Sequence, residues 1–165
     1  MNYLNISHCN QVNGDGLRSV IWVAGCDRKC PGCFSEHTHD FKAGLKFTDN
    51  AKNELFNKSH LDWCSGITIL GGEPLHLHNR TEVISLAKEY KDKFPTKTIW
   101  LYSGYTYDEI INDDTMSPIL NYIDVLCAGP YIQELRDLNK PWVGSSNQEV
   151  INIKRRIEQV SHIKR

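Results

Sequence analysis

Three cysteine side chains lie within eight residues of one another, in the segment Cys26-Asp27-Arg28-Lys29-Cys30-Pro31-Gly32-Cys33. Thiolates are soft ligands that suit iron-sulfur clusters and zinc, and a loop this short can wrap three of them around one metal centre. A structural zinc site or a closed iron-sulfur electron carrier normally has four protein ligands. Three cysteines on a four-iron cluster leave one iron open to an outside ligand, which is what a catalytic centre requires.

The cysteine spacing alone leaves a second interpretation open. His37, His39, Cys9 or Cys64 could supply a fourth ligand, and the loop would then hold structural zinc in a binding module. Against this, Cys9, Cys64 and Cys127 are isolated in the sequence, and an isolated cysteine is usually a small buried hydrophobe.

A second motif, Gly71-Gly72-Glu73-Pro74-Leu75, directly follows an apolar segment at 67–70. Two glycines let the backbone approach a ligand closely, and Glu73 adds a carboxylate that could hold the ammonium group of a ligand. Taken alone, the motif is better explained as a tight turn between a strand and a helix, with a solvated glutamate.

The elements that must position these motifs alternate between short apolar strands and helices. The expected strands are 19–24, 67–70, 98–102, 123–127 and 150–153, and the expected helices are 49–57, 80–94 and 107–111. Such alternation predicts an α/β architecture with parallel pairing and right-handed crossovers. Ligands of such sheets bind at the carboxyl ends of the strands, where Cys26, Gly71, Ser103 and Gly129 are all expected.

Length and composition exclude several classes of function. A chain of 165 residues has room for one domain, but a complete eight-stranded barrel needs at least about 200 residues. We therefore expect a partial β/α barrel, open along one side. The net charge of -1 gives no basis for nucleic-acid binding. No segment is apolar enough for a membrane span or a secretory signal, so we expect a cytoplasmic protein.

Together, the two motifs resemble the signatures of the radical S-adenosylmethionine (SAM) superfamily, which include an aromatic residue after the last cysteine, here Phe34. The likeness extends to the family of proteins that activate the anaerobic ribonucleoside-triphosphate reductase. Further segments similar to that family are 13–16, 98–106, 124–126, 129–131, 134–138 and 144–148. The resemblance covers residues 1–153, taken as a radical SAM domain, and leaves 154–165 as a basic C-terminal tail. Glu149 and Cys127 depart from the family's pattern.

The resemblance also implies a set of site residues. Cys26, Cys30 and Cys33 would bind three irons of a 4Fe-4S cluster, and the methionine part of SAM would bind the fourth. Gly71, Gly72 and Glu73, with Pro74 in the same turn, would contact the methionine end of SAM. Gly32, Cys33 and Phe34 would lie at the adenine or the edge of the cluster, and Ser103 would make polar contacts to SAM.

The implied activity is reductive cleavage of SAM to a 5'-deoxyadenosyl radical. That radical would remove hydrogen from a glycine in the large subunit of the reductase and leave a glycyl radical there. Reduced flavodoxin or a similar donor would supply the electron. A different radical SAM enzyme, acting on a small molecule, is the alternative within the same superfamily.

Overall fold

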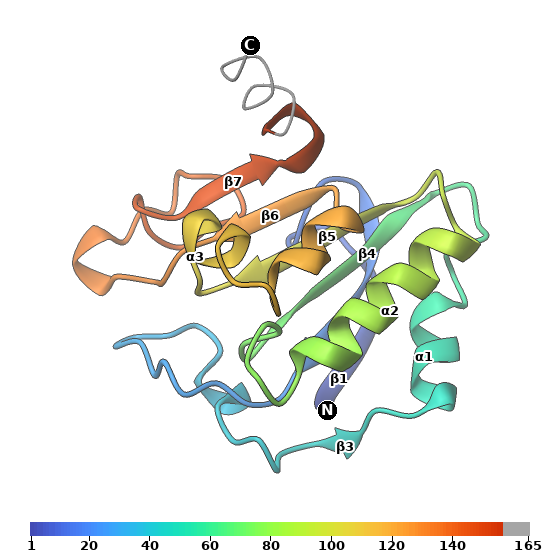
Figure 1. The fold of residues 1–165 in the computed structure, drawn as a ribbon, viewed down its shortest axis with the longest axis horizontal. Coiled ribbons are helices and arrows are strands. Elements are labelled where there is room, and N and C mark those ends of the chain that lie inside the picture. The colour runs from blue at the N-terminus through green and yellow to red at the C-terminus, as the bar shows by residue number, and fades with distance from the viewer. Residues whose placement is uncertain (157–165) are drawn as a thin grey trace.

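An open seven-stranded sheet carries the functional motifs, with the helices packed on one of its faces (Figure 1). The computed structural model describes residues 1–156. The strands are β1 Asn2–Asn10, β2 Leu17–Val23, β3 Leu45–Lys46, β4 Cys64–Gly71, β5 Thr98–Ser103, β6 Val125–Ala128 and β7 Glu149–Asn152. The helices are α1 Asp49–Phe56, α2 Arg80–Lys93 and α3 Tyr107–Ile111, with short 3-10 turns η1 Glu36–Thr38, η2 Ser117–Asn121 and η3 Gln133–Leu135.

The strand order β3-β1-β2-β4-β5-β6-β7 places a parallel block between antiparallel edges. Strands β2, β4, β5 and β6 pair in parallel, which confirms the predicted α/β class. The expectation of parallel pairing is wrong for the last strand, because β7 runs antiparallel to β6. Between β6 and β7 the chain forms only the short 3-10 turn η3, whereas parallel strands are usually joined by an α-helix that crosses the sheet.

The sequence pattern did not predict β1. Six of its nine residues are asparagine, serine, histidine or cysteine, and only Tyr3 is buried. It pairs antiparallel with β2 on one side and with β3 on the other, so its neighbours hold it in place despite a weak apolar pattern.

The two faces of the parallel block differ in what covers them. Ile69, Leu101 and Leu126 belong to a buried core that also contains the apolar residues of α1 and α2. Alternate residues along a strand point to opposite faces, so Leu70, Tyr102 and Cys127 lie on the other face. In Figure 1 the helices lie on the viewer's side of the sheet, and loops border its far face.

Arg18 is buried on that far face near the beginning of the parallel strands, with 1% of its surface exposed. Its guanidinium donates to Thr68 Oγ1 at 2.9 Å, to Thr98 Oγ1 at 3.0 Å, and to the carbonyl oxygens of Asp15, Ile67 and Thr98 at 2.9, 2.8 and 2.7 Å. Removal from water lowers its pKa to about 10. One side chain thus ties three consecutive strands together.

The described residues contain no helix that is both long and apolar enough to cross a membrane. Most of the predicted tail, residues 157–165, lies outside the part of the chain that the structure describes. The domain boundary at residue 153 stays a prediction.

Replacing Arg18 with methionine should lower the free energy of unfolding by about 3 kcal/mol, because buried carbonyl oxygens lose their donors. Chemical denaturation of the reduced protein measures the change. Arg18→Lys is the matched control, because it keeps the charge but cannot donate to all these acceptors. Its free energy of unfolding should lie between those of wild type and Arg18→Met. Equal stability of wild type and Arg18→Met would contradict a role for Arg18 in joining the strands.

Candidate functional site

The carboxyl ends of β2, β4, β5 and β6 border one cavity of about 640 Å³. Eight of the predicted site residues line it: Cys26, Cys30, Cys33, Phe34, Gly71, Gly72, Glu73 and Ser103. Two predicted residues are not among its lining residues. Gly32 turns toward Gln133 of η3, where an added Cβ would come within 3.0 Å of the side-chain oxygen, and Pro74 is buried within its turn. The cavity otherwise unites both motifs, as their expected positions at the strand ends predicted.

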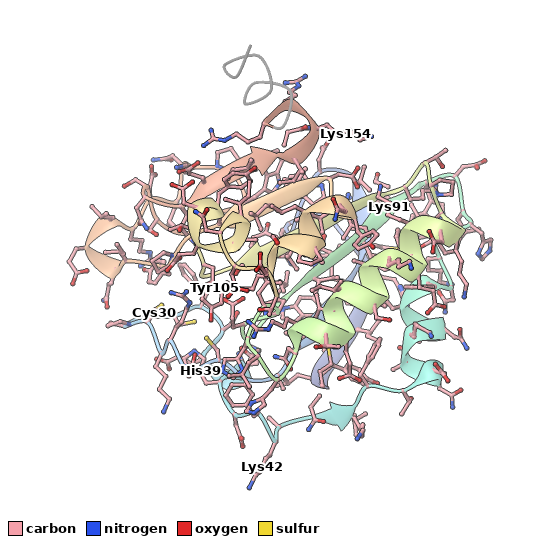
Figure 2. All side chains as sticks on the ribbon, viewed as in Figure 1. Cys30, His39, Lys42, Lys91, Tyr105 and Lys154 are labelled. Atoms are coloured by element: carbon pink, nitrogen blue, oxygen red, sulfur yellow. The ribbon has the colours of Figure 1, made fainter. Side chains whose placement is uncertain are left out.

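The cysteine loop is shaped by its own backbone contacts. The amide of Gly25 donates to Thr38 O at 2.7 Å, and the amide of Cys26 donates to His39 O at 3.1 Å, so the far end of the loop returns to its start. The Cys33 amide donates to Cys30 O at 3.1 Å, which closes a tight turn between two of the thiols. These contacts hold the three thiols at one side of the cavity, where Figure 2 labels Cys30.

The thiols of Cys26 and Cys33 are half-buried, and removal from water raises the pKa of each. Backbone amides oppose the rise, including that of Ser35, which lies 3.4 Å from Cys33 Sγ. Such amides stabilise negative charge on sulfur. Binding of a cation would supply the remaining stabilisation of the thiolates.

The glycine-rich turn is clamped against the strand that leads into the cysteine loop. Gly72 donates to Val23 O at 2.8 Å, and Glu73 donates to Gly25 O at 2.7 Å. A Cβ atom at Gly72 would lie 2.4 Å from the carbonyl oxygen of Gly25. The sequence motif predicts that the two glycines let the backbone approach a ligand closely. In the structure, Gly72 instead permits a close approach to the backbone at Gly25.

Glu73 is buried, with 1% of its surface exposed, so the interpretation as a solvated turn residue is wrong. Its Oε1 accepts from Leu75 N at 2.9 Å and from Ser103 Oγ at 2.8 Å, and its Oε2 accepts from Gly104 N at 2.7 Å. Burial raises the pKa of the carboxyl group, although these donors oppose the rise. The carboxylate thus joins the end of β4 to the end of β5.

Arg28, which sequence reasoning did not select, supplies a positive charge at the same place. Its Nε lies 3.7 Å from Glu73 Oε2, and its guanidinium lies 4.1 Å from the centre of the Tyr105 ring. That Nε is buried without a hydrogen-bond partner. The only signal in the sequence was an arginine between two cluster cysteines, since neither partner is near it in the chain.

A histidine beside the glycine-rich turn is also more buried than expected for a loop histidine. His76 is 6% exposed, and its Nε2 lies 3.3 Å from the carboxylate of Asp27 in the cysteine loop. Its ring packs against Phe41 at 4.5 Å between centroids. The contact is a second link between the two motifs, on the outer side of the loop.

The residues considered for a fourth ligand are scattered. Cys64 begins β4 and Cys9 pairs near the beginning of β2, both at the opposite end of the sheet from Cys26. His39 lines the cavity, and His37 is exposed. Within residues 1–156, no three His, Cys, Asp or Glu side chains converge closely enough to hold a single metal ion. Three thiols spread around one cavity fit a polynuclear cluster, in which each thiolate binds a different iron.

The fold and the site define an iron-sulfur protein with an α/β sheet, and the comparisons agree. Residues 12–151 match the family described as a 4Fe-4S single cluster domain. The chain is 39% identical over 150 residues to the anaerobic ribonucleoside-triphosphate reductase-activating protein of Enterobacteria phage T4, covering 91% of this chain and 93% of that protein.

Proteins of the same name in Haemophilus influenzae and Escherichia coli K12 are 36% and 33% identical over 156 residues. These matches cover 93% of this chain and 99% and 100% of the two relatives. The chain belongs to the family of anaerobic ribonucleoside-triphosphate reductase-activating proteins.

The raised pKa of Glu73 predicts a pH dependence of stability. Its value in the unfolded chain is near 4.5, and above that pH the folded state binds more protons than the unfolded state. Stability should therefore fall as pH rises from 4.5 through the folded-state pKa, and remain lower above it. Denaturant titrations over this pH range measure how the free energy of unfolding changes with pH. The Glu73→Gln variant should lack the part of this change that is due to Glu73. An equal slope in both proteins would refute the assignment.

Proposed function

We propose that the chain is a radical SAM enzyme that activates the large subunit of an anaerobic ribonucleoside-triphosphate reductase. One observation carries the proposal: three thiols from one loop line the same cavity as the backbone of Gly71 and Gly72 and the carboxylate of Glu73. The relatives named above are reductase-activating proteins, which supports the choice of partner.

When bound, the 4Fe-4S cluster and SAM would supply an electron and a 5'-deoxyadenosyl radical able to take hydrogen from a glycine of the reductase. Cys26, Cys30 and Cys33 would hold the cluster. A fourth cysteine, Cys127, also lines the cavity, but it is buried on β6 and lies outside the cysteine loop. The loop itself offers three thiols, which would leave one iron of the cluster for SAM to coordinate. The electron would come from reduced flavodoxin or a comparable donor.

Opposite charges lie side by side where SAM would place its amino-acid end. The Glu73 carboxylate and the Arg28 guanidinium are close together at the cavity wall, and Arg28 has one donor without a partner. A zwitterionic amino acid presents an ammonium and a carboxylate that such a pair can bind. We assign the ammonium to the Glu73 side and the carboxylate to Arg28, with Ser103 holding Glu73 in place.

The open sheet would let a protein substrate enter, as expected for the proposed partial barrel. The sheet is open, and its cavity lies at the carboxyl ends of the parallel strands and extends over the face without helices. Phe34 packs on Tyr131 at 5.2 Å between centroids, which covers one side of the cysteine loop. The segment carrying the target glycine would enter on the remaining side.

Cys30→Ala should lose the iron and sulfide of a 4Fe-4S cluster after anaerobic reconstitution and should release no 5'-deoxyadenosine. Cys9→Ala is the matched control, because Cys9 is exposed on β1 at the other end of the sheet. Metal analysis, visible absorbance and chromatography of the nucleoside products provide the measurements. Unchanged cluster content in Cys30→Ala would contradict the assignment of Cys30 as a cluster ligand. Stoichiometric zinc without iron would favour a zinc-stabilised binding module.

Arg28→Gln should weaken SAM binding about 10- to 100-fold, the range for losing one charge-assisted hydrogen bond. Equilibrium dialysis with labelled SAM on the reconstituted protein measures the affinity directly. Iron content, measured in parallel, separates this loss from damage to the cysteine loop. Wild-type affinity in a fully loaded variant would remove Arg28 from the SAM site. Electron paramagnetic resonance of the mixture with reductase tests the target, since a small-molecule enzyme would leave no glycyl radical.

A further inference from the structure

Exposed apolar side chains gather around the mouth of the cysteine-lined cavity. Nine large apolar residues within the described chain are exposed: Val12, Phe34, Leu45, Trp63, Leu77, Ile111, Leu135, Leu138 and Trp142. Of these, Val12, Phe34, Leu138 and Trp142 line this one cavity. Val12 is 73% exposed and Leu138 is 70% exposed. Single exposed apolar residues are ordinary, whereas a group of them beside a cavity marks a site of interaction.

Three of these four side chains, Val12, Leu138 and Trp142, come from two loops outside the cysteine loop and form the apolar rim. Val12 lies between β1 and β2, and Leu138 and Trp142 lie between β6 and β7. The second loop is closed by its own hydrogen bonds, from Asp137 N to Gly144 O at 3.0 Å and from Ser146 N to Leu135 O at 2.8 Å. Leu138 is therefore exposed on a loop whose conformation is held by hydrogen bonds.

Trp142 is held in an unfavourable conformation at the centre of the rim. Its φ of 63° lies in the left-handed region, which bulky residues seldom occupy. Its ring packs at 4.9 Å on Trp100, which is buried on the helix-free face of the sheet. Strained residues of this kind gather at binding and switch sites, and tryptophan is among the side chains enriched at the energetic hot spots of protein interfaces.

The same tryptophan also lines a second cavity, of about 560 Å³, along the uncovered face toward the other end of the strands. The surface beyond the rim is thus concave on both sides of Trp142. A bound SAM molecule would need only the part of the first cavity beside the cysteines and the glycine-rich turn. The apolar rim comes from other loops and would be free to contact a larger occupant.

We infer that Val12, Leu138 and Trp142 form the docking surface for the segment of the reductase that carries the target glycine. The inference rests on the proposed function, which requires a backbone segment of another protein to reach this cavity. Glycine offers no side chain to bind, so the affinity must come from residues that flank it. An apolar rim continuous with the cavity fits apolar flanking residues of an extended segment, since burying such side chains stabilises a complex.

Leu138→Asp and Leu45→Asp make a matched pair for the test. The two leucines are 70% and 65% exposed, but Leu45 lies on the edge strand β3, away from the cavity. Binding to the purified reductase large subunit is measured anaerobically by surface plasmon resonance with cluster-loaded protein. Leu138→Asp should weaken binding about 10-fold or more, as expected for charging a buried interface residue. Leu45→Asp should bind like wild type.

Trp142→Ala and Val12→Asp extend the test, and thermal unfolding confirms that each variant is folded. Equal affinities of Leu138→Asp, Leu45→Asp and wild type would overturn the docking surface. The proposed function is judged separately by 5'-deoxyadenosine release from wild type without reductase. Because binding needs no chemistry, a wild type that fails to cleave SAM would count against the activity, and the affinity comparison would still decide the docking surface.

Discussion

The hydrogen bonds between the end of β2 and the glycine-rich turn after β4 are the constraint on which the site depends. Gly72 and Glu73 donate to carbonyl oxygens of Val23 and Gly25, immediately before the first cluster cysteine. The separation of these two backbones leaves no room for a Cβ atom at Gly71 or Gly72. Cys26, the first of the predicted cluster ligands, is thereby fixed to the end of a strand, as precise metal coordination requires.

A buried carboxylate extends this constraint to the neighbouring strand. Glu73 accepts three hydrogen bonds from Leu75, Ser103 and Gly104, which is the compensation that a buried carboxyl group needs. The same group faces the Arg28 guanidinium from the cysteine loop. Structural support and the proposed recognition of SAM therefore fall on one side chain, and a substitution of Glu73 should affect both.

Much of this could be predicted from the sequence because the two motifs are local. The order of the elements also followed from alternating apolar segments, and α2 and α3 were predicted to within one residue. The features that the sequence did not predict depend on contacts between residues far apart in the chain. Strand β1 is polar and owes its position to two neighbouring strands. Arg28 stands out only through its contacts with Glu73 and Tyr105. Periodicity carries no information on such contacts.

The uncovered face of the sheet follows from the order in which the parallel strands are wound. Strands β2, β4, β5 and β6 are neighbours in chain order, without a reversal. Right-handed crossovers in one continuous direction place every connecting helix on the same face, and Figure 1 shows α1, α2 and α3 there. A doubly wound sheet reverses direction and covers both faces. Here the second face is left to the loops before β2 and β7. The proposed approach of a reductase segment to the cysteines depends on this absence of helices.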